Sequence, residues 1–82
     1  MGRNRKTEAQ RRAEQFGERY RMGKAKLALK EPQMAEILGV SPMTLRKYRS
    51  QPGLFSVDQL GKIGKVMCWT DEDYLAIIRP ER

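Results

Sequence analysis

The chain has 82 residues, a formal net charge of +7 and a hydrophobic fraction of 39%. This length predicts one domain that buries about 60% of its unfolded surface, and no apolar run is long enough to span a membrane. Histidine is absent and cysteine occurs once, which excludes an internal disulfide, the common zinc sites and a nucleophile–base pair. We therefore expect a cytoplasmic protein that is not an enzyme and has neither a cofactor nor a small-molecule ligand.

Positive charge is concentrated toward the N-terminus. Residues 1–30 contain ten Lys or Arg and three Glu, whereas residues 31–82 contain seven residues of each sign. A second local cluster comprises Arg46, Lys47 and Arg49. Clustered positive charge on a small domain favours a polyanionic partner. The alternative is that the charge serves solubility alone.

The first six residues combine three cations with almost no apolar content. This composition predicts a disordered basic arm over residues 1–6, followed by a single domain over residues 7–82. Arg3, Arg5 and Lys6 can follow the phosphates or a groove of DNA. A solvated tail without a binding role is the alternative.

A capping box at residues 7–10 predicts a long helix that ends between Gly23 and Leu27. Apolar residues at three- and four-residue steps give this helix one core-facing stripe. Gly17 and Gly23 weaken a helix, so they predict close packing against a neighbour or a break near Gly23. We expect residues 27–29 to form a buried linker. The stripe comprises Ala9, Ala13, Phe16, Tyr20, Gly23 or Lys24, and Leu27.

The middle of the chain predicts two short helices joined by a tight turn. Pro32 suits the first turn of a helix that ends at Leu38. Gly39 then supplies the left-handed residue that stops it. Ser41 caps a second helix, which we expect to end near Ser50.

Two further helices are predicted after residues 51–53, whose proline and glycine end the preceding helix. A capping box begins a helix over Val57–Met67, and two glycines inside it predict close contact with another helix. Thr70 caps a last helix over Asp71–Ile78. Acidic residues 71–73 lie where the helix dipole favours carboxylates, which explains them better than a cation site does.

The middle region resembles the helix-turn-helix of lambda-repressor/Cro-type transcriptional regulators. Small Ala35 permits close approach of the two helices, and Gly39 supplies a positive φ. Leu45 and Tyr48 fix the second helix against the first. The resemblance extends over about residues 16–78. It implies an all-α, five-helix orthogonal bundle and a sequence-specific regulator that binds double-stranded DNA, such as a phage or mobile-element repressor.

In that family the second helix of the motif enters the major groove. Carried over by position, the base-contacting residues are Ser41, Pro42, Met43, Arg46 and Lys47. The candidates for contact with the DNA backbone are Thr44, Arg49, Gln33, Arg3, Arg5 and Lys6. Arg46 is the main candidate for direct readout, because arginine forms two hydrogen bonds with guanine O6 and N7.

Two positions depart from the family pattern. Glu31 stands where the first helix of the motif often begins with glutamine, and its charge would repel a phosphate. Arg49 replaces an acidic residue, and we expect it to contact a phosphate or to pair with a carboxylate such as Glu36. Cations of the long first helix can replace the lost phosphate anchor. The candidates are Arg12, Arg19 and Lys24.

A protein-interaction or assembly module, such as a phage-packaging adaptor or an antitoxin-like partner, is the alternative function. Apolar residues near the C-terminus exceed the needs of one stripe on a short helix, so they can form a partner or homodimer surface. They are Trp69, Tyr74, Ile77 and Ile78. Packing into the small core is the competing interpretation. We expect Cys68 to be a small packing residue rather than a reactive thiol.

Overall fold

The computed structural model describes residues 6–80, which form five α-helices and one 3₁₀ turn. The helices are α1 (Glu8–Leu27), α2 (Glu31–Leu38), α3 (Pro42–Ser50), α4 (Val57–Met67) and α5 (Asp71–Ile78), and the turn spans Pro52–Leu54. No strand occurs among the described residues. None of their helices is both long and apolar enough to cross a membrane. The prediction of an all-α protein with five helices is confirmed.

Side-chain caps explain where most of these helices begin. Thr7, Ser56 and Thr70 each accept a hydrogen bond from the backbone N–H three residues on, and each has the reciprocal bond of a capping box. The Ser41 side chain accepts from the backbone N–H of Thr44 at the start of α3. These bonds are local, so the helix starts follow from short stretches of sequence.

Three helices end in a left-handed residue. Gly39 follows α2 with a φ of 72°, whereas Ala28 and Cys68 follow α1 and α4 with φ of 55° and 58°. Glycine adopts this conformation freely, but a residue with a Cβ pays a steric cost there. Gly39 therefore closes the turn between α2 and α3 without strain.

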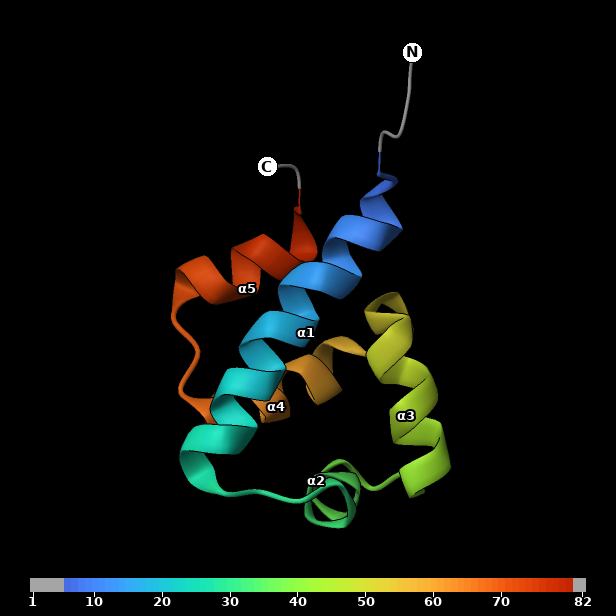
Figure 1. Ribbon diagram of the computed structural model, residues 1–82, viewed down its shortest axis with the longest axis vertical. Coiled ribbons are helices and arrows are strands. Elements are labelled where there is room, and N and C mark those ends of the chain that lie inside the picture. The colour runs from blue at the N-terminus through green and yellow to red at the C-terminus, as the bar shows by residue number, and fades with distance from the viewer. Residues whose placement is uncertain (1–5, 81–82) are drawn as a thin grey trace.

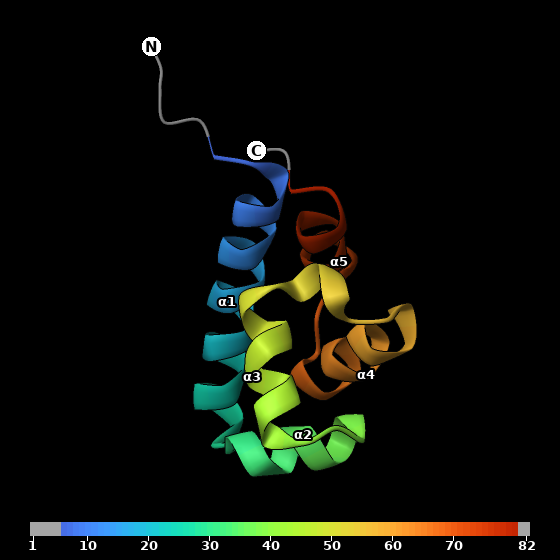
Figure 2. The same ribbon diagram turned by 90° about the vertical axis from the view of Figure 1, so that its right-hand side faces the viewer.

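Helix α1 is the longest of these helices and packs against α3, α4 and α5 (Figure 1), which all lie to one side of it in the view of Figure 2. Its Phe16 and Tyr20 are fully buried and stack with ring centroids 5.2 Å apart. Phe55 packs against Phe16 at 5.2 Å and against Tyr48 of α3 at 5.3 Å. These rings join α1 to α3. The other buried hydrophobic residues are Met34, Ala35, Leu38, Leu45, Ile63, Met67 and Ile77.

The link between α1 and α2 differs from the expected buried linker. Leu27 and Ala28 are exposed, and only Leu29 packs against the core. Leu27 lies in the last turn of α1, just before the chain reverses at Ala28. Residues at a helix end have fewer neighbours than residues in its middle, so an apolar residue there can remain in contact with water.

The helical glycines divide into two groups. A Cβ added at Gly23 would lie 2.6 Å from Met67 Sδ, and one added at Gly64 would overlap the ring of Tyr74. Close packing is confirmed at these two positions. Gly17 and Gly61 have no such neighbour within 4 Å of an added Cβ, so the expectation of close packing is wrong there.

Candidate nucleic-acid interface

The α2–α3 pair lies at one end of the molecule, with α2 crossing steeply beneath α3 (Figure 2). The turn between them is closed by a hydrogen bond from Val40 N to Ala35 O, at 3.0 Å. Ala35 and Leu45 are buried, and Tyr48 is half-buried against the core. Together with Gly39, these side chains hold α3 at a fixed angle to α2.

The start of α3 is exposed. Ser41, Pro42 and Met43 all face solvent, and Met43 is 80% exposed. The Ser41 hydroxyl accepts from Thr44 N at 3.1 Å and donates to Thr44 Oγ1 at 3.0 Å. Thr44 is half-buried. The polar group of Ser41 therefore already serves the cap, whereas Pro42 and Met43 offer apolar surface.

Arg46 and Lys47 supply positive charge to the same stretch of α3. Both are exposed. Neither forms an ion pair with any residue between 6 and 80. Their charges are therefore not neutralised by the described part of the protein and are accessible to a polyanion that approaches α3.

Arg49 is engaged inside the protein, and its partner is Glu31 rather than Glu36. Glu31 Oε2 accepts from Arg49 Nη1 and from Lys24 Nζ, both at 2.7 Å, and the Tyr20 hydroxyl lies 3.4 Å away. The Arg49 guanidinium also lies over the Tyr20 ring, 4.9 Å from its centroid. Burial raises the pKa of the Tyr20 hydroxyl, and the charge of Glu31 raises it further. We call these four residues, Tyr20, Lys24, Glu31 and Arg49, the Glu31 cluster.

Gln33 has a structural role at the start of α2. Its Oε1 accepts a hydrogen bond from Lys30 N at 2.8 Å, which satisfies a backbone N–H at the helix start. Gln33 is exposed, so its amide nitrogen can still reach a phosphate while its oxygen caps the helix.

The cations of α1 that were expected to replace the phosphate anchor bind the protein's own groups instead. Arg12 donates to the carbonyl oxygens of Ile77 and Ile78 at 2.8 and 3.1 Å. Arg19 Nε donates to Asp73 Oδ1 at 2.8 Å. Lys24 belongs to the Glu31 cluster. These three cations are therefore engaged within the protein, and the expectation that they anchor a phosphate stays a prediction.

Asp73 serves as a cap and as an ion-pair partner. Its carboxylate accepts from Thr70 N at 2.9 Å at the start of α5, besides its pair with Arg19. The hydrogen bond from the Thr70 backbone, followed by the bond from Arg19, lowers the pKa of Asp73 below the ordinary value of an aspartate. Among the described residues, no group of His, Cys, Asp or Glu side chains could hold a metal ion.

Of the predicted basic arm, residues 1–6, the structure describes only Lys6. Lys6 is exposed and pairs with Glu14 of α1. Arg3 and Arg5 lie outside the described residues.

The C-terminal apolar residues do not form one surface. Ile77 is 1% exposed and belongs to the core, so its expected place in a partner surface is wrong. Trp69 and Tyr74 are half-buried and contact each other with centroids 5.5 Å apart. Ile78 is exposed, as is Leu75 three residues before it. Ile77 therefore packs in the core of this small domain. Leu75 and Ile78 are the exposed large hydrophobic residues of α5.

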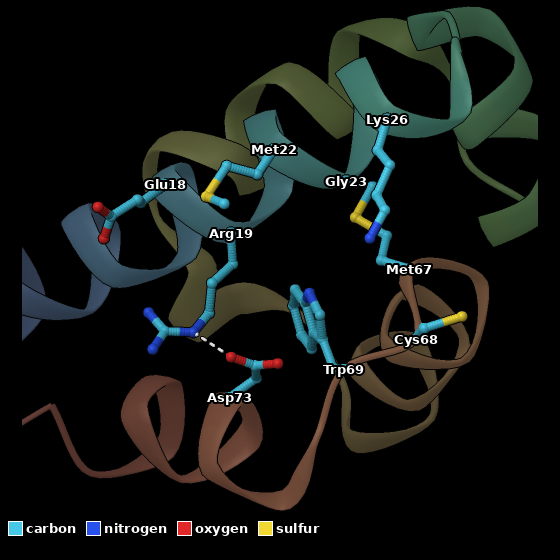
Figure 3. Close-up of a pocket in the computed structure, with 9 residues that line it drawn as sticks. All are labelled: Glu18, Arg19, Met22, Gly23, Lys26, Met67, Cys68, Trp69 and Asp73. Atoms are coloured by element: carbon cyan, nitrogen blue, oxygen red, sulfur yellow. Dashed lines mark hydrogen bonds and ion pairs between the residues drawn. The ribbon is translucent and has the colours of Figure 1, made fainter.

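A groove of about 410 Å³ lies between α1 and the link from α4 to α5 (Figure 3). The Arg19–Asp73 ion pair, the Trp69 ring, and Met22 and Lys26 of α1 are among the groups that line it (Figure 3). Cys68 lies on its edge and is exposed, so the expectation that it packs in the interior is wrong. No residue of α2 or α3 lines this groove, which separates it from the α3 surface.

Comparisons with protein-family models, with curated proteins and with solved structures found no match to this chain.

The feature that sequence reasoning missed is the Glu31 cluster. Glu31 is 7 residues from Lys24 and 18 from Arg49, and the three lie on different helices. Opposite charges at these separations occur by chance in any charged sequence. The only sequence signal for this cluster was Glu31 itself, an acidic residue at a position where the resembled family often has glutamine.

Proposed function

We propose that this protein is a sequence-specific DNA-binding regulator of the lambda-repressor/Cro type, a repressor of a phage or mobile element. Its five helices form the orthogonal bundle of that family, and α3 reads double-stranded DNA. The observation that carries the proposal is the exposed surface of α3 formed by Pro42, Met43, Arg46 and Lys47. On this surface, Arg46 and Lys47 have no ion-pair partner among residues 6–80.

The chemistry of α3 fits a major groove. The groove of B-form DNA admits an α-helix, and each base pair presents a distinct pattern of donors, acceptors and methyl groups there. Arg46 grips O6 and N7 of a guanine, and Met43 contacts a thymine methyl group. Lys47 and Thr44 bind a base or a phosphate nearby. In this proposal the protein acts in the cytoplasm by binding alone, without catalysis or a cofactor.

The test is the variant Arg46→Ala, measured on a target site selected from a random oligonucleotide pool. The affinity should fall by about 1–3 kcal/mol at fixed salt, and the preference at one base pair should relax, because alanine cannot form the two hydrogen bonds to guanine. Arg21→Ala is the matched control, since it removes the same side chain from an exposed position on α1. Equal affinity of Arg46→Ala and the parent for the selected site would contradict the assignment of α3.

We also propose that two copies bind together. One such domain reads a short half-site, and two copies about 34 Å apart read a palindrome. Leu75 and Ile78 of α5 are both exposed and supply apolar surface for the contact between copies. Light scattering of the complex with a palindromic duplex should give two protein chains per duplex.

An assembly or partner-binding module is the second candidate. The exposed Leu75 and Ile78 of α5 and the groove beside Trp69 favour it. In the view of Figure 1, α5 and α3 lie on opposite sides of α1, and no residue of α3 lines the groove, so both would serve a protein partner. The salt dependence of binding to random-sequence duplex separates the two functions. A DNA binder releases counterions, so its log K falls linearly with log[salt], whereas a slope near zero favours the partner-binding module.

A further inference from the structure

The Glu31 cluster joins three helices through one carboxylate oxygen. Lys24 lies near the end of α1, Glu31 is the first residue of α2, and Arg49 lies in the last turn of α3. Glu31 Oε2 is 2.7 Å from both cations. All three side chains are about one-quarter to one-third exposed, so the cluster lies at the surface and not in the core.

The charges in the cluster do not cancel. Two cations share one carboxylate, which leaves one net positive charge, and Arg49 lies on the same helix as Arg46 and Lys47. Carboxylate and phosphate oxygens bind arginine and lysine by the same charge-assisted hydrogen bonds. Glu31 therefore occupies donors on Lys24 and Arg49 that a DNA phosphate would otherwise accept from.

We infer that Glu31 is a specificity-determining residue, which acts as an internal competitor of DNA phosphate for Lys24 and Arg49. This inference rests on the proposed function. Contacts to phosphate are independent of base sequence and supply nearly all of the non-specific affinity. Because Glu31 engages two cations beside α3, it lowers binding to random DNA, while Arg46 and Lys47 stay free to contact DNA.

The experiment measures the binding of each variant to a random-sequence duplex between 50 and 200 mM salt. Glu31→Gln keeps the shape of the side chain but removes its charge, so Lys24 and Arg49 become available to phosphates. The slope of log K against log[salt] should steepen by about 0.9 for each additional phosphate that the variant neutralises. With one or two additional phosphates bound, the affinity should fall about three- to twelvefold more than that of the parent across this salt range.

Glu36→Gln is the matched control. It makes the same substitution on the same helix, at an exposed residue that has no ion pair within the described part of the chain. Both variants raise the net charge by one. If the two variants show the same slope, only total charge matters and the inference is overturned.

A second variant keeps the test decisive if Glu31→Gln does not fold. In the parent, Arg49 is paired with Glu31 and is not available to a phosphate. Arg49→Met should therefore leave the salt slope nearly the same as that of the parent. Lys47→Met should reduce that slope by about 0.9, because Lys47 is free to contact a phosphate. A reduction of similar size in Arg49→Met would show that Arg49 already binds DNA, and it would overturn the inference.

Failure of the proposed function gives a different result. If the parent protein binds duplex without salt dependence, the proposed function fails and this inference fails with it. If the parent shows a clear negative slope but Glu31→Gln matches Glu36→Gln, the proposed function stands and only the role of Glu31 is wrong.

Discussion

At the scale of single residues, Gly61 and Gly64 occupy the same helix but have different surroundings. An added Cβ at Gly64 would lie 2.7 Å from Tyr74 Cε1 and closer still to the end of that ring. The ring cannot easily retreat, because it also packs against the edge of Trp69 at 5.5 Å between centroids. Gly61 has open space where its Cβ would be.

We predict opposite effects of alanine at these two positions. Gly64→Ala should lower the free energy of unfolding by about 1–3 kcal/mol, since α4 and α5 must separate to admit the methyl group. Gly61→Ala should raise it by about 0.5–1 kcal/mol, because alanine loses less backbone entropy in a helix. Urea denaturation followed by circular dichroism measures both. A stabilising Gly64→Ala would contradict the close packing described between α4 and α5.

At the scale of the elements, two helices are followed by a non-glycine residue in the left-handed conformation, which has a steric cost. Helix α4 ends at Met67 and is followed by Cys68, whose φ of 58° disfavours any residue with a Cβ. Trp69 N nevertheless donates to Gly64 O at 2.9 Å, so the cap is formed despite this cost. The return of the chain toward α5 depends on this reversal.

Cys68→Gly should therefore raise the free energy of unfolding by about 1 kcal/mol, because glycine adopts the left-handed conformation without a steric penalty. Cys68→Ala is the control and should change it little, since alanine keeps the Cβ and the thiol that it replaces is exposed to solvent. Thermal unfolding of the three proteins at one pH compares them. Equal stability of the Gly and Ala variants would rule out conformational cost at this cap.

At the scale of the whole molecule, ion pairs connect helices that are distant in the sequence. Arg19 of α1 and Asp73 of α5 are 54 residues apart, and their ion pair joins the first helix to the last. The pKa of Asp73 is lowered in the folded state, first by the Thr70 backbone and then by Arg19. In moderate acid the unfolded chain therefore binds more protons at Asp73 than the native state does.

The sign of the pH dependence follows from this lowered pKa. The stabilisation from Asp73 is fully present above about pH 4, the ordinary pKa range of an aspartate, and is lost as the pH falls through the lower native value. Asp73→Asn should therefore reduce the loss of stability on acidification, and Arg19→Met should reduce it in part. Urea unfolding at a series of pH values between about 3 and 6 tests this. An unchanged acid profile in Asp73→Asn would exclude this role of Asp73.

The sequence by itself determined the helices, because the signals that begin and end them act over only a few residues. Ser56 and Thr70 each bond a backbone N–H three positions on, and Gly39 alone supplies the left-handed turn after α2. These signals gave α3, α4 and α5 the bounds that the structure shows. The resemblance to a helix-turn-helix, together with the cluster of Arg46, Lys47 and Arg49, indicated α3 as the candidate surface.

Only the tertiary structure decided which charged side chains remain free. The sequence does not distinguish Arg46 from the other helical arginines Arg12, Arg19 and Arg49. In the structure each of those three bonds to a group on another helix, whereas Arg46 has no ion-pair partner among residues 6–80. A charge finds its partner through the docking of whole helices, which residue spacing does not encode. For the same reason the burial of Ile77 and the exposure of Leu27 became apparent only when the helices were packed together.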